Sequence, residues 1–256
     1  MVGVYSIEGN KVGELELPPV FKTEPRPDLV RRAFLSEVSR KYQPKGVDPM
    51  AGKRTSAETW GKGFGVARVR RVKGSRHPSA GRGAFAPFTV GGRRAHPPKT
   101  EEVLEEKINK KEYLLALKSA IACTAKKELV LARGHKCEPP ELPLIVSREI
   151  EELKKTKEVK VVLEKLGVWQ DVERAKAGRR IRAGKGKRRG RKYRKPVGPL
   201  VVVGDDKGIS KAARNLPGVE VVGVKELSVE KLAPGGVPGR LTVWSESAIR
   251  QLEEIL

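Results

Sequence analysis

The sequence is poor in several residue types, and each shortage argues against a class of protein. It has only two cysteines, Cys123 and Cys137, which is too few for a disulfide framework, so we expect reduced thiols. No run of eighteen apolar residues occurs, so no membrane-spanning helix is expected. The first residues do not show the basic segment followed by an apolar segment that is typical of a secretory signal. Asparagine, glutamine and methionine are scarce while a third of the chain is charged, a bias that favours a heat-adapted source.

Acidic residues are almost lacking in two stretches, and these stretches hold the whole surplus of positive charge. Residues 43–98 contain twelve Lys or Arg and two acids, a net charge of +10. Residues 174–195 contain thirteen Lys or Arg and no acid, which completes the +23 of the chain. The remaining 178 residues are neutral, with 29 basic and 29 acidic side chains. A neutral body with two cationic segments predicts a large polyanion as partner, and nucleic acid is the first candidate.

Outside these segments the hydrophobic pattern predicts an α/β fold. Residues 2–7 and 12–17 flank a turn and are typical of a β-hairpin. Pro27 suits the first turn of a helix with Phe34 on its apolar face, and we expect this helix to end near Gln43. The last sixty residues alternate helices with continuous Val and Leu strands. This alternation predicts a three-layer domain with a mainly parallel sheet covered by helices.

The other elements expected in the body follow from the same periodicities. They are a helix from the N-cap Thr100 to Ile121, a strand at 142–146, helices at 148–153, 158–166 and 169–175, a strand at 200–203, a helix at 209–215, a strand at 219–222, a helix at 229–232, a strand at 241–244 and a final helix capped by Ser245. Trp169 and Trp244 are expected to be core anchors.

Residues 43–98 show no periodicity and contain ten glycines and six prolines. Such a stretch buries too little apolar surface to order itself, and it is uncommon inside a compact domain unless it is functional or disordered. We therefore expect a globular body of residues 1–42 and 99–256, which contains the basic segment 174–196, and an extended basic loop of residues 43–98. As a stretched hairpin, each limb of the loop would reach at most roughly 90 Å.

Aromatic and imidazole side chains are interleaved with the cations of this loop. Flat groups can stack on unpaired bases while Arg and Lys meet phosphates, and glycines let the backbone approach RNA closely. An arm that orders against RNA is therefore favoured over a disordered insert. The interleaved residues are Trp60, Phe64, His77, Phe85, Phe88 and His96.

Two other interpretations of the basic segments have less support. Gly61, Gly63 and Gly65 suggest a phosphate-cradling loop, but a dinucleotide-binding loop follows a strand and opens a helix, and the residues around these glycines predict neither. Residues 174–195 are too densely charged for an ordinary solvated face, and self-repulsion should keep them disordered without a polyanion. An anionic membrane ranks below RNA because the run lacks the bulky apolar face of an interfacial helix.

Catalytic and metal sites are also weakly supported. Asp205 and Asp206 follow an expected strand and could hold Mg²⁺, but a turn in which Asp caps the next helix is favoured, because no third ligand lies nearby in the sequence. Cys123, His135 and Cys137 do not have the paired spacing of a structural zinc site. With three histidines, two of them in the basic loop, Ser-His-Asp catalysis has no support.

Six segments resemble the family of ribosomal protein four of the large subunit, in its archaeal and eukaryotic form. The segments occur in the order of the family and extend over essentially the whole chain, with a more variable part at residues 73–88. They are KRTSAETWGKGFGVARV (Lys53–Val69), VGGRRAHPPK (Val90–Lys99), RAGKGKRRGRKYRKPVGPL (Arg182–Leu200), RNLPGV (Arg214–Val219), LAPGG (Leu232–Gly236) and VWSESA (Val243–Ala248).

The resemblance implies a structural constituent of the large ribosomal subunit that acts in early assembly, without catalysis, cofactor or metal. It implies that the loop of residues 43–98 enters ribosomal RNA, and that its tip, between Val72 and Phe88, lines part of the nascent-peptide exit tunnel. The implied partners are large-subunit rRNA, neighbouring ribosomal proteins and the nascent peptide, without membrane or homo-oligomer, at a cytoplasmic location in the large subunit. The alternatives are a metal-dependent RNA-processing enzyme that uses Asp205 and Asp206, and a general nucleic-acid compaction protein.

The residues expected to bind rRNA are cations and flat side chains of both basic segments. In the loop they are Lys53, Arg54, Trp60, Lys62, Phe64, Arg68, Arg70, Arg71, Lys73, Arg76, His77, Arg82, Arg93, Arg94 and His96. In the second segment they are Arg179, Arg180, Arg182, Lys185, Lys187, Arg188, Arg189, Arg191, Lys192, Tyr193, Arg194 and Lys195.

Overall fold

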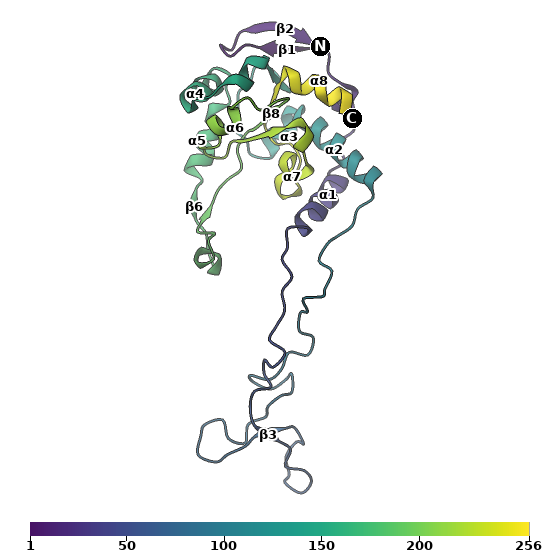
Figure 1. Ribbon diagram of the computed structural model, residues 1–256, viewed down its shortest axis with the longest axis vertical. Coiled ribbons are helices and arrows are strands. Elements are labelled where there is room, and N and C mark those ends of the chain that lie inside the picture. Colours follow the sequence, from purple (N-terminus) through teal and green to yellow (C-terminus); the bar gives the residue numbers. More distant parts are fainter. Residues whose placement is uncertain (256) are drawn as a thin grey trace. The chain divides into compact units, whose positions relative to one another are not determined.

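The computed structural model describes residues 1–255, which divide into two compact units. The body comprises Met1–Arg40 and the chain from Glu106 onward, and the loop unit comprises Lys41–Glu105 (Figure 1). Within residues 1–255, no helix is both long enough and apolar enough to cross a membrane.

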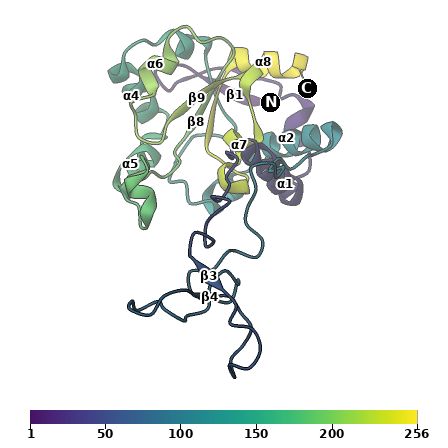
Figure 2. The ribbon, with the colours of Figure 1, turned by 60° about the horizontal axis from the view of Figure 1, so that its bottom comes forward.

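The body contains a six-stranded sheet in the order β2-β1-β5-β10-β8-β9, in which β1 and β2 are antiparallel and all other neighbours are parallel. Figure 2 labels β1, β8 and β9 of this sheet. The parallel strands are short and rich in Val, Leu and Ile, as expected for strands that are buried on both faces. The strands are β1 (Val2–Tyr5), β2 (Lys11–Leu15), β5 (Leu144–Val146), β8 (Leu200–Val203), β9 (Glu220–Gly223) and β10 (Thr242–Ser245).

Helices cover both faces of this sheet. Along β8, Leu200 and Val202 belong to one apolar cluster and Val201 and Val203 to another, because successive side chains of a strand point to opposite faces. The first cluster packs against α1 (Pro27–Ser39), α2 (Lys110–Thr124), α7 (Val229–Leu232) and α8 (Glu246–Ile255). The second packs against α3 (Lys127–Ala132), α4 (Thr156–Lys165), α5 (Trp169–Ala177) and α6 (Ile209–Ala213).

One-turn 3₁₀ helices complete the connections of the body. They are η1 (Pro19–Lys22), η2 (Arg148–Glu152), η3 (Lys185–Arg188), η4 (Val224–Glu226) and η5 (Pro234–Gly236). The ring of Phe21 from η1 meets the fully buried indole of Trp244 edge-on, with 5.5 Å between the ring centroids. Trp244 is therefore a core anchor, as the sequence predicts, whereas Trp169 is partly buried at the edge of the second cluster.

The start of α2 differs from the expected helix start at Thr100. The helix begins at Lys110, ten residues later. Before it, the N–H of Glu106 donates to Ser39 Oγ over 3.0 Å, and the Ser36 hydroxyl donates to the Glu106 carbonyl over 2.7 Å. These contacts from α1 occupy the backbone groups that an earlier helix would need, so the apolar periodicity before Lys110 does not decide the helix start.

The end of α1 is also earlier than expected. The helix ends at Ser39 instead of near Gln43, and its buried face contains the small residues Ala33, Ser36 and Ser39 while Phe34 is half-buried. Small side chains let helices approach one another closely, and α1 contacts α2, α7 and η5.

A buried carboxylate, Glu151, ties together the carboxyl ends of the central strands. Its Oε1 accepts hydrogen bonds from the Gly204 N–H after β8 over 2.9 Å, from the Ser245 hydroxyl at the end of β10 over 2.8 Å, and from the Ser247 hydroxyl. Ser245 Oγ also accepts a bond from the Ala248 N–H over 3.1 Å, which confirms the expected N-cap of the last helix. Glu151 is fully buried, and these bonds compensate the loss of hydration at Oε1, while Oε2 has no hydrogen-bond partner among the described residues.

We expect Glu151→Ala to lower the free energy of unfolding by about 2–4 kcal/mol, because it leaves buried donors unpaired and opens a cavity. The matched control is Glu152→Ala, which removes a largely exposed carboxylate that pairs with Lys207 and should cost less than about 1 kcal/mol. Urea denaturation followed by circular dichroism measures both. Equal losses for the two variants would contradict the role of Glu151.

Candidate nucleic-acid interface

The loop unit contains a small β-structure, although the sequence of residues 43–98 predicts no regular structure. Strand β3 (Ala57–Glu58) pairs antiparallel with β4 (Arg71–Val72), and Arg71 bridges to Gly83 on the other side of β4. Backbone bonds from Val72 N to the Arg82 carbonyl over 3.0 Å and from the Ala84 N–H to the Arg70 carbonyl over 2.7 Å extend this pairing. Three segments distant in sequence therefore converge in this unit.

Close backbone approaches hold the two limbs of the loop unit together. A β-carbon added to Gly46 would lie 3.0 Å from Thr100 Cγ2, and one added to Gly52, where φ is +74°, would collide with the backbone of Gly92. Among the described residues of this unit, Ala84 is the only buried apolar side chain. The unit thus has backbone pairing without a hydrophobic core, which places it at the low end of local stability.

The predicted contact residues face solvent in both basic segments. Of the 27 residues, Arg71 is half-buried and the other 26 are exposed. Two of these predicted contact residues in the loop unit are paired with carboxylates, Lys73 with Glu58 over 2.6 Å and Arg54 with Asp48. Exposed cations in these numbers are available to an external polyanion.

Aromatic rings of the loop unit lie against its guanidinium groups. The guanidinium carbon of Arg71 lies 5.2 Å from the centroid of the Trp60 ring, and the ring of Phe64 lies 5.9 Å from Trp60. Arg70 lies 5.2 Å from the centroid of the Phe85 ring. These are cation–π distances, so the arginines are pre-ordered by their own aromatic neighbours.

The predicted contact set contains Trp60 and Phe64 but omits Phe85 and Phe88. The structure shows that Phe85 belongs to the same kind of arginine–aromatic pair as Trp60. The signal that could have found both residues is present in the sequence, because they alternate with cations in the same loop.

The second basic segment forms a hairpin, in contrast to the disorder expected from self-repulsion. Strand β6 (Arg180–Ile181) pairs with β7 (Tyr193–Arg194), with η3 between them. The ring of Tyr193 has Arg179 at 4.4 Å and Lys192 at 5.6 Å from its centroid, which places cations on a shared aromatic platform. Within residues 1–255, no carboxylate forms an ion pair with a cation of residues 179–195, so their charge stays uncompensated by the protein.

A buried charged cluster fixes the base of this hairpin to the body. Asp171 of α5 is fully buried and accepts bonds from Arg174 Nε over 2.7 Å, from the Lys136 N–H over 3.0 Å and from His135 Nδ1 over 2.9 Å. Arg174 then donates to the carbonyl of Val197, directly after the hairpin, over 2.6 Å. Residues on both sides of the hairpin are thus joined through one guanidinium.

A second buried arginine holds the segment that returns from the hairpin. Arg240, 1% exposed, donates from Nε to the Gly198 carbonyl over 3.0 Å, and from Nη1 to Glu220 and to the Lys231 carbonyl over 2.8 Å each. Burial lowers the pKa of Arg240, and the attraction of Glu220 opposes this shift. Burial raises the pKa of Glu220, but Arg240 and Lys231 outweigh it, so the pKa of Glu220 lies below its usual value and the carboxylate is ionised at neutral pH.

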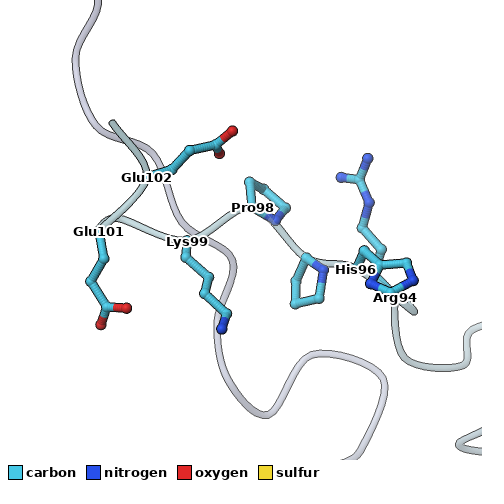
Figure 3. A pocket seen from close by; sticks show the side chains of 7 residues that line it. Arg94, His96, Pro98, Lys99, Glu101 and Glu102 are labelled. Carbon is cyan, nitrogen blue, oxygen red and sulfur yellow. The ribbon is translucent and has the colours of Figure 1, made fainter. Parts of the chain in front are cut away.

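A hollow of about 600 Å³ along residues 94–102 has a lining of mixed charge. Figure 3 shows Arg94 and His96 at one end of this stretch and Glu101 and Glu102 at the other, with side chains that do not converge on one point. Because carboxylates repel phosphate, this hollow is not where we expect an RNA backbone to be held.

The residues weighed for catalysis and metal binding have structural roles. Asp206 Oδ1 accepts the N–H of Gly208 over 3.0 Å and that of Ser210 over 3.3 Å, as in the predicted turn, but the N-cap position of α6 is occupied by Gly208 and not by an aspartate. Cys123 and Cys137 are buried free thiols, and His135 pairs with Asp171. In the part of the chain that the structure describes, no three His, Cys, Asp or Glu side chains gather as metal ligands.

The glycines at residues 61, 63 and 65 do not form a nucleotide-binding loop. All three have positive φ, between +64° and +91°, and the chain after them continues into strand β4. A dinucleotide site would need a helix N-terminus at this point.

Comparison with known proteins shows the family of the chain. The ribosomal protein L4/L1 family matches residues 15–255. This chain belongs to that family. It is similar to "Large ribosomal subunit protein uL4" of Methanocaldococcus jannaschii, with 57% identity over 251 residues, 98% of this chain and 97% of the relative. The proteins of the same name from Methanosphaera stadtmanae and Methanococcus vannielii are 52% and 54% identical, covering 99% of this chain and 96% and 98% of their own lengths.

The family match confirms the resemblance drawn from the six segments. It covers both the body and the loop unit, so the two cationic segments belong to the matched region. A structural ribosomal constituent without catalysis, as inferred from the sequence, agrees with the names of these relatives.

We expect Asp171→Asn to lower the free energy of unfolding by about 3 kcal/mol at neutral pH, because it removes one partner of a buried charged cluster. Burial raises the pKa of Asp171, but hydrogen bonds from His135 and Arg174 outweigh it, so its pKa lies below the usual 3.8. A depressed folded-state pKa stabilises the protein above about pH 4, and this stabilisation is lost as the pH falls through the folded-state value. The difference between wild type and variant should therefore shrink below about pH 4.

The measurement is the urea midpoint from neutral pH to acid, with Glu173→Gln as control on the same helix. Glu173 is exposed and accepts only a surface bond from the Trp169 indole, so its replacement should change stability little at any pH. A difference between Asp171→Asn and wild type that stays constant with pH would show that the carboxylate charge is not the stabilising feature.

Proposed function

We propose that this chain is a non-catalytic structural constituent of the large ribosomal subunit, which binds large-subunit rRNA through its two cationic segments. The observation that carries the proposal is the hairpin of residues 179–195, whose exposed cations have no carboxylate partner in the described chain. Such a surface gains most from neutralising phosphates and releasing their counterions. Family membership supports rRNA as the polyanion, since the relatives are large-subunit proteins by name.

The loop of residues 43–98 is proposed as the second rRNA-binding element, carried by a body of residues 1–42 and 99–256. Its support is a surface of exposed cations and arginine–aromatic pairs on a unit without a core. A segment of this kind loses conformational entropy when it orders, so it binds well only to a preformed or co-folding RNA surface. This requirement suits a role in early subunit assembly.

The tip of that loop, between Val72 and Phe88, is proposed to line part of the nascent-peptide exit tunnel. The support is the family resemblance together with the tight turns of this stretch, such as the bond from the Ala80 N–H to the His77 carbonyl over 3.0 Å. Neighbouring ribosomal proteins and the nascent peptide are then the further partners, and the protein is located in the large ribosomal subunit.

Large-subunit rRNA should compete for the protein far better than arbitrary duplex RNA at physiological salt, because a rigid hairpin base presents the cations in one orientation. Replacing Arg188 and Arg189 together by Gln should reduce the slope of log affinity against log salt by about 1.5. The matched control replaces the exposed body residues Lys211 and Lys225 by Gln and should leave the slope unchanged. Fluorescence anisotropy at several salt concentrations measures all three proteins.

Two outcomes of this competition oppose the proposal. Equal affinity for rRNA and duplex would favour a general compaction protein, and an equal change of slope in both double variants would mean that charge alone, without position, governs binding.

Amides of the loop unit should exchange with solvent much faster than those of β8 and β10 when no RNA is present, because its backbone bonds lack a covering core. Binding of rRNA should then slow exchange across residues 61–92 more than in the body. Hydrogen–deuterium exchange with mass spectrometry measures both effects. Full protection of residues 61–92 in the free protein would show that the loop is already ordered without RNA.

A further inference from the structure

A second hollow in the loop unit has a lining that suits a nucleotide. Its volume is about 530 Å³, within the range of about 300–1,000 Å³ typical of small-molecule sites. Most of the lining is apolar and includes Phe85 and Phe88. Among the described residues that line it, the charged ones are Lys53, Arg70 and Arg93, and all three are cations. Apolar and aromatic side chains together with cations complement a base and its phosphate.

Backbone contacts fix the conformation of the chain around this hollow. Phe85 has a φ of +65°, a left-handed conformation that side chains other than glycine rarely adopt. Its carbonyl accepts the N–H of Arg93 over 3.1 Å, and the Ala86 N–H donates to the Ala84 carbonyl over 2.8 Å. Gly92 approaches the Ala86 carbonyl so closely that a β-carbon there would collide with it. Strained backbone that neighbouring contacts maintain is concentrated at functional sites.

The aromatic rings of the loop unit differ in which side chains of the protein already stack on them. Trp60 has Arg71 over its face and Phe64 beside it, and Phe85 has Arg70 at 5.2 Å. Phe88 is 78% exposed, and within residues 1–255 neither an aromatic ring nor a cation stacks on it. The stacking surface that remains for a ligand at this hollow is therefore the ring of Phe88.

We propose that this hollow binds one unpaired nucleotide of RNA, with the base stacked on Phe88 and its phosphate held by Lys53 and Arg93. The base must be unpaired, because a base inside a duplex has both faces stacked and cannot present one to a protein ring. This inference rests on the proposed rRNA binding and adds a specific contact to it, in which Phe88 joins two cations of the predicted contact set.

The location of the contact can be tested by photo-crosslinking with the full-length protein. The probe is a single-stranded oligoribonucleotide of about twelve nucleotides, within the site sizes of single-strand binders, with one 5-iodouridine at its centre. Irradiation followed by mass spectrometry should find crosslinks at Phe88 or Phe85. Tyr193, in the other basic segment, serves as the internal reference for RNA binding.

Affinity measurements on the same oligonucleotide separate stacking from charge. Phe88→Leu should bind about tenfold more weakly, and Phe88→Tyr should keep wild-type affinity, because only the tyrosine retains an aromatic face. Neither variant should change the salt slope, whereas Lys53→Gln should reduce it by about 0.7. Val90→Ala, which changes a fully exposed apolar residue outside the hollow, should bind as wild type does.

Three results would overturn the inference. Crosslinks at Tyr193 without any at Phe85 or Phe88 would place the RNA elsewhere on the protein and leave the proposed function intact. Equal affinities of wild type and Phe88→Leu would show that the ring does not stack on a base. Absence of crosslinks from both basic segments, with no affinity for the oligonucleotide or for rRNA, would reject the nucleotide site together with the proposed function.

Discussion

Positive charge that the protein cannot neutralise by itself constrains the rest of this structure. The residues outside 43–98 and 174–195 have equal numbers of acids and bases and include the covered sheet, whereas these two segments carry the whole net charge of +23. In the hairpin of residues 179–195 the described chain provides no carboxylate partner. Repulsion among such cations favours separation of the segments from one another and association with an external polyanion. The apolar residues that stabilise the fold and the cations that are expected to bind a polyanion thus lie in different parts of the chain.

The body contributes to binding by positioning. Arg174 is anchored to the buried carboxylate of Asp171 and Arg240 to the exposed carboxylate of Glu220, and both arginines donate to backbone carbonyls just after the hairpin. Buried charged clusters of this kind add little net stability, but they hold one geometry, because each group loses its hydrogen bonds if the others move. Such an anchor gives a cationic hairpin a defined direction, which distinguishes recognition of one folded RNA from general attraction to phosphate.

Sequence patterns predicted the elements of the body best where a strand is buried on both of its faces. The strand at residues 200–203 matches β8 in both bounds, because a short run of Val and Leu between turn residues has few other solutions, and the helix at 229–232 matches α7 in both bounds. The predicted start of the helix at Thr100 was wrong, since bonds from Ser36 and Ser39 hold the backbone of Glu106 in another conformation, and α2 begins only at Lys110. The local periodicity of a sequence does not show which contacts a helix distant in sequence will make.

The sequence by itself determined the class of fold, the two cationic segments, the family and the kind of partner, because composition and periodicity are summed over many residues. Only the tertiary structure decided which of these residues come together. It joined Asp171 to His135 and Arg174, ordered the hairpin around Tyr193, and brought Phe88 beside Lys53 in one hollow. These contacts depend on how separate segments pack and turn, and a positive φ or a close backbone approach at a glycine is set by that packing and not by the neighbouring letters.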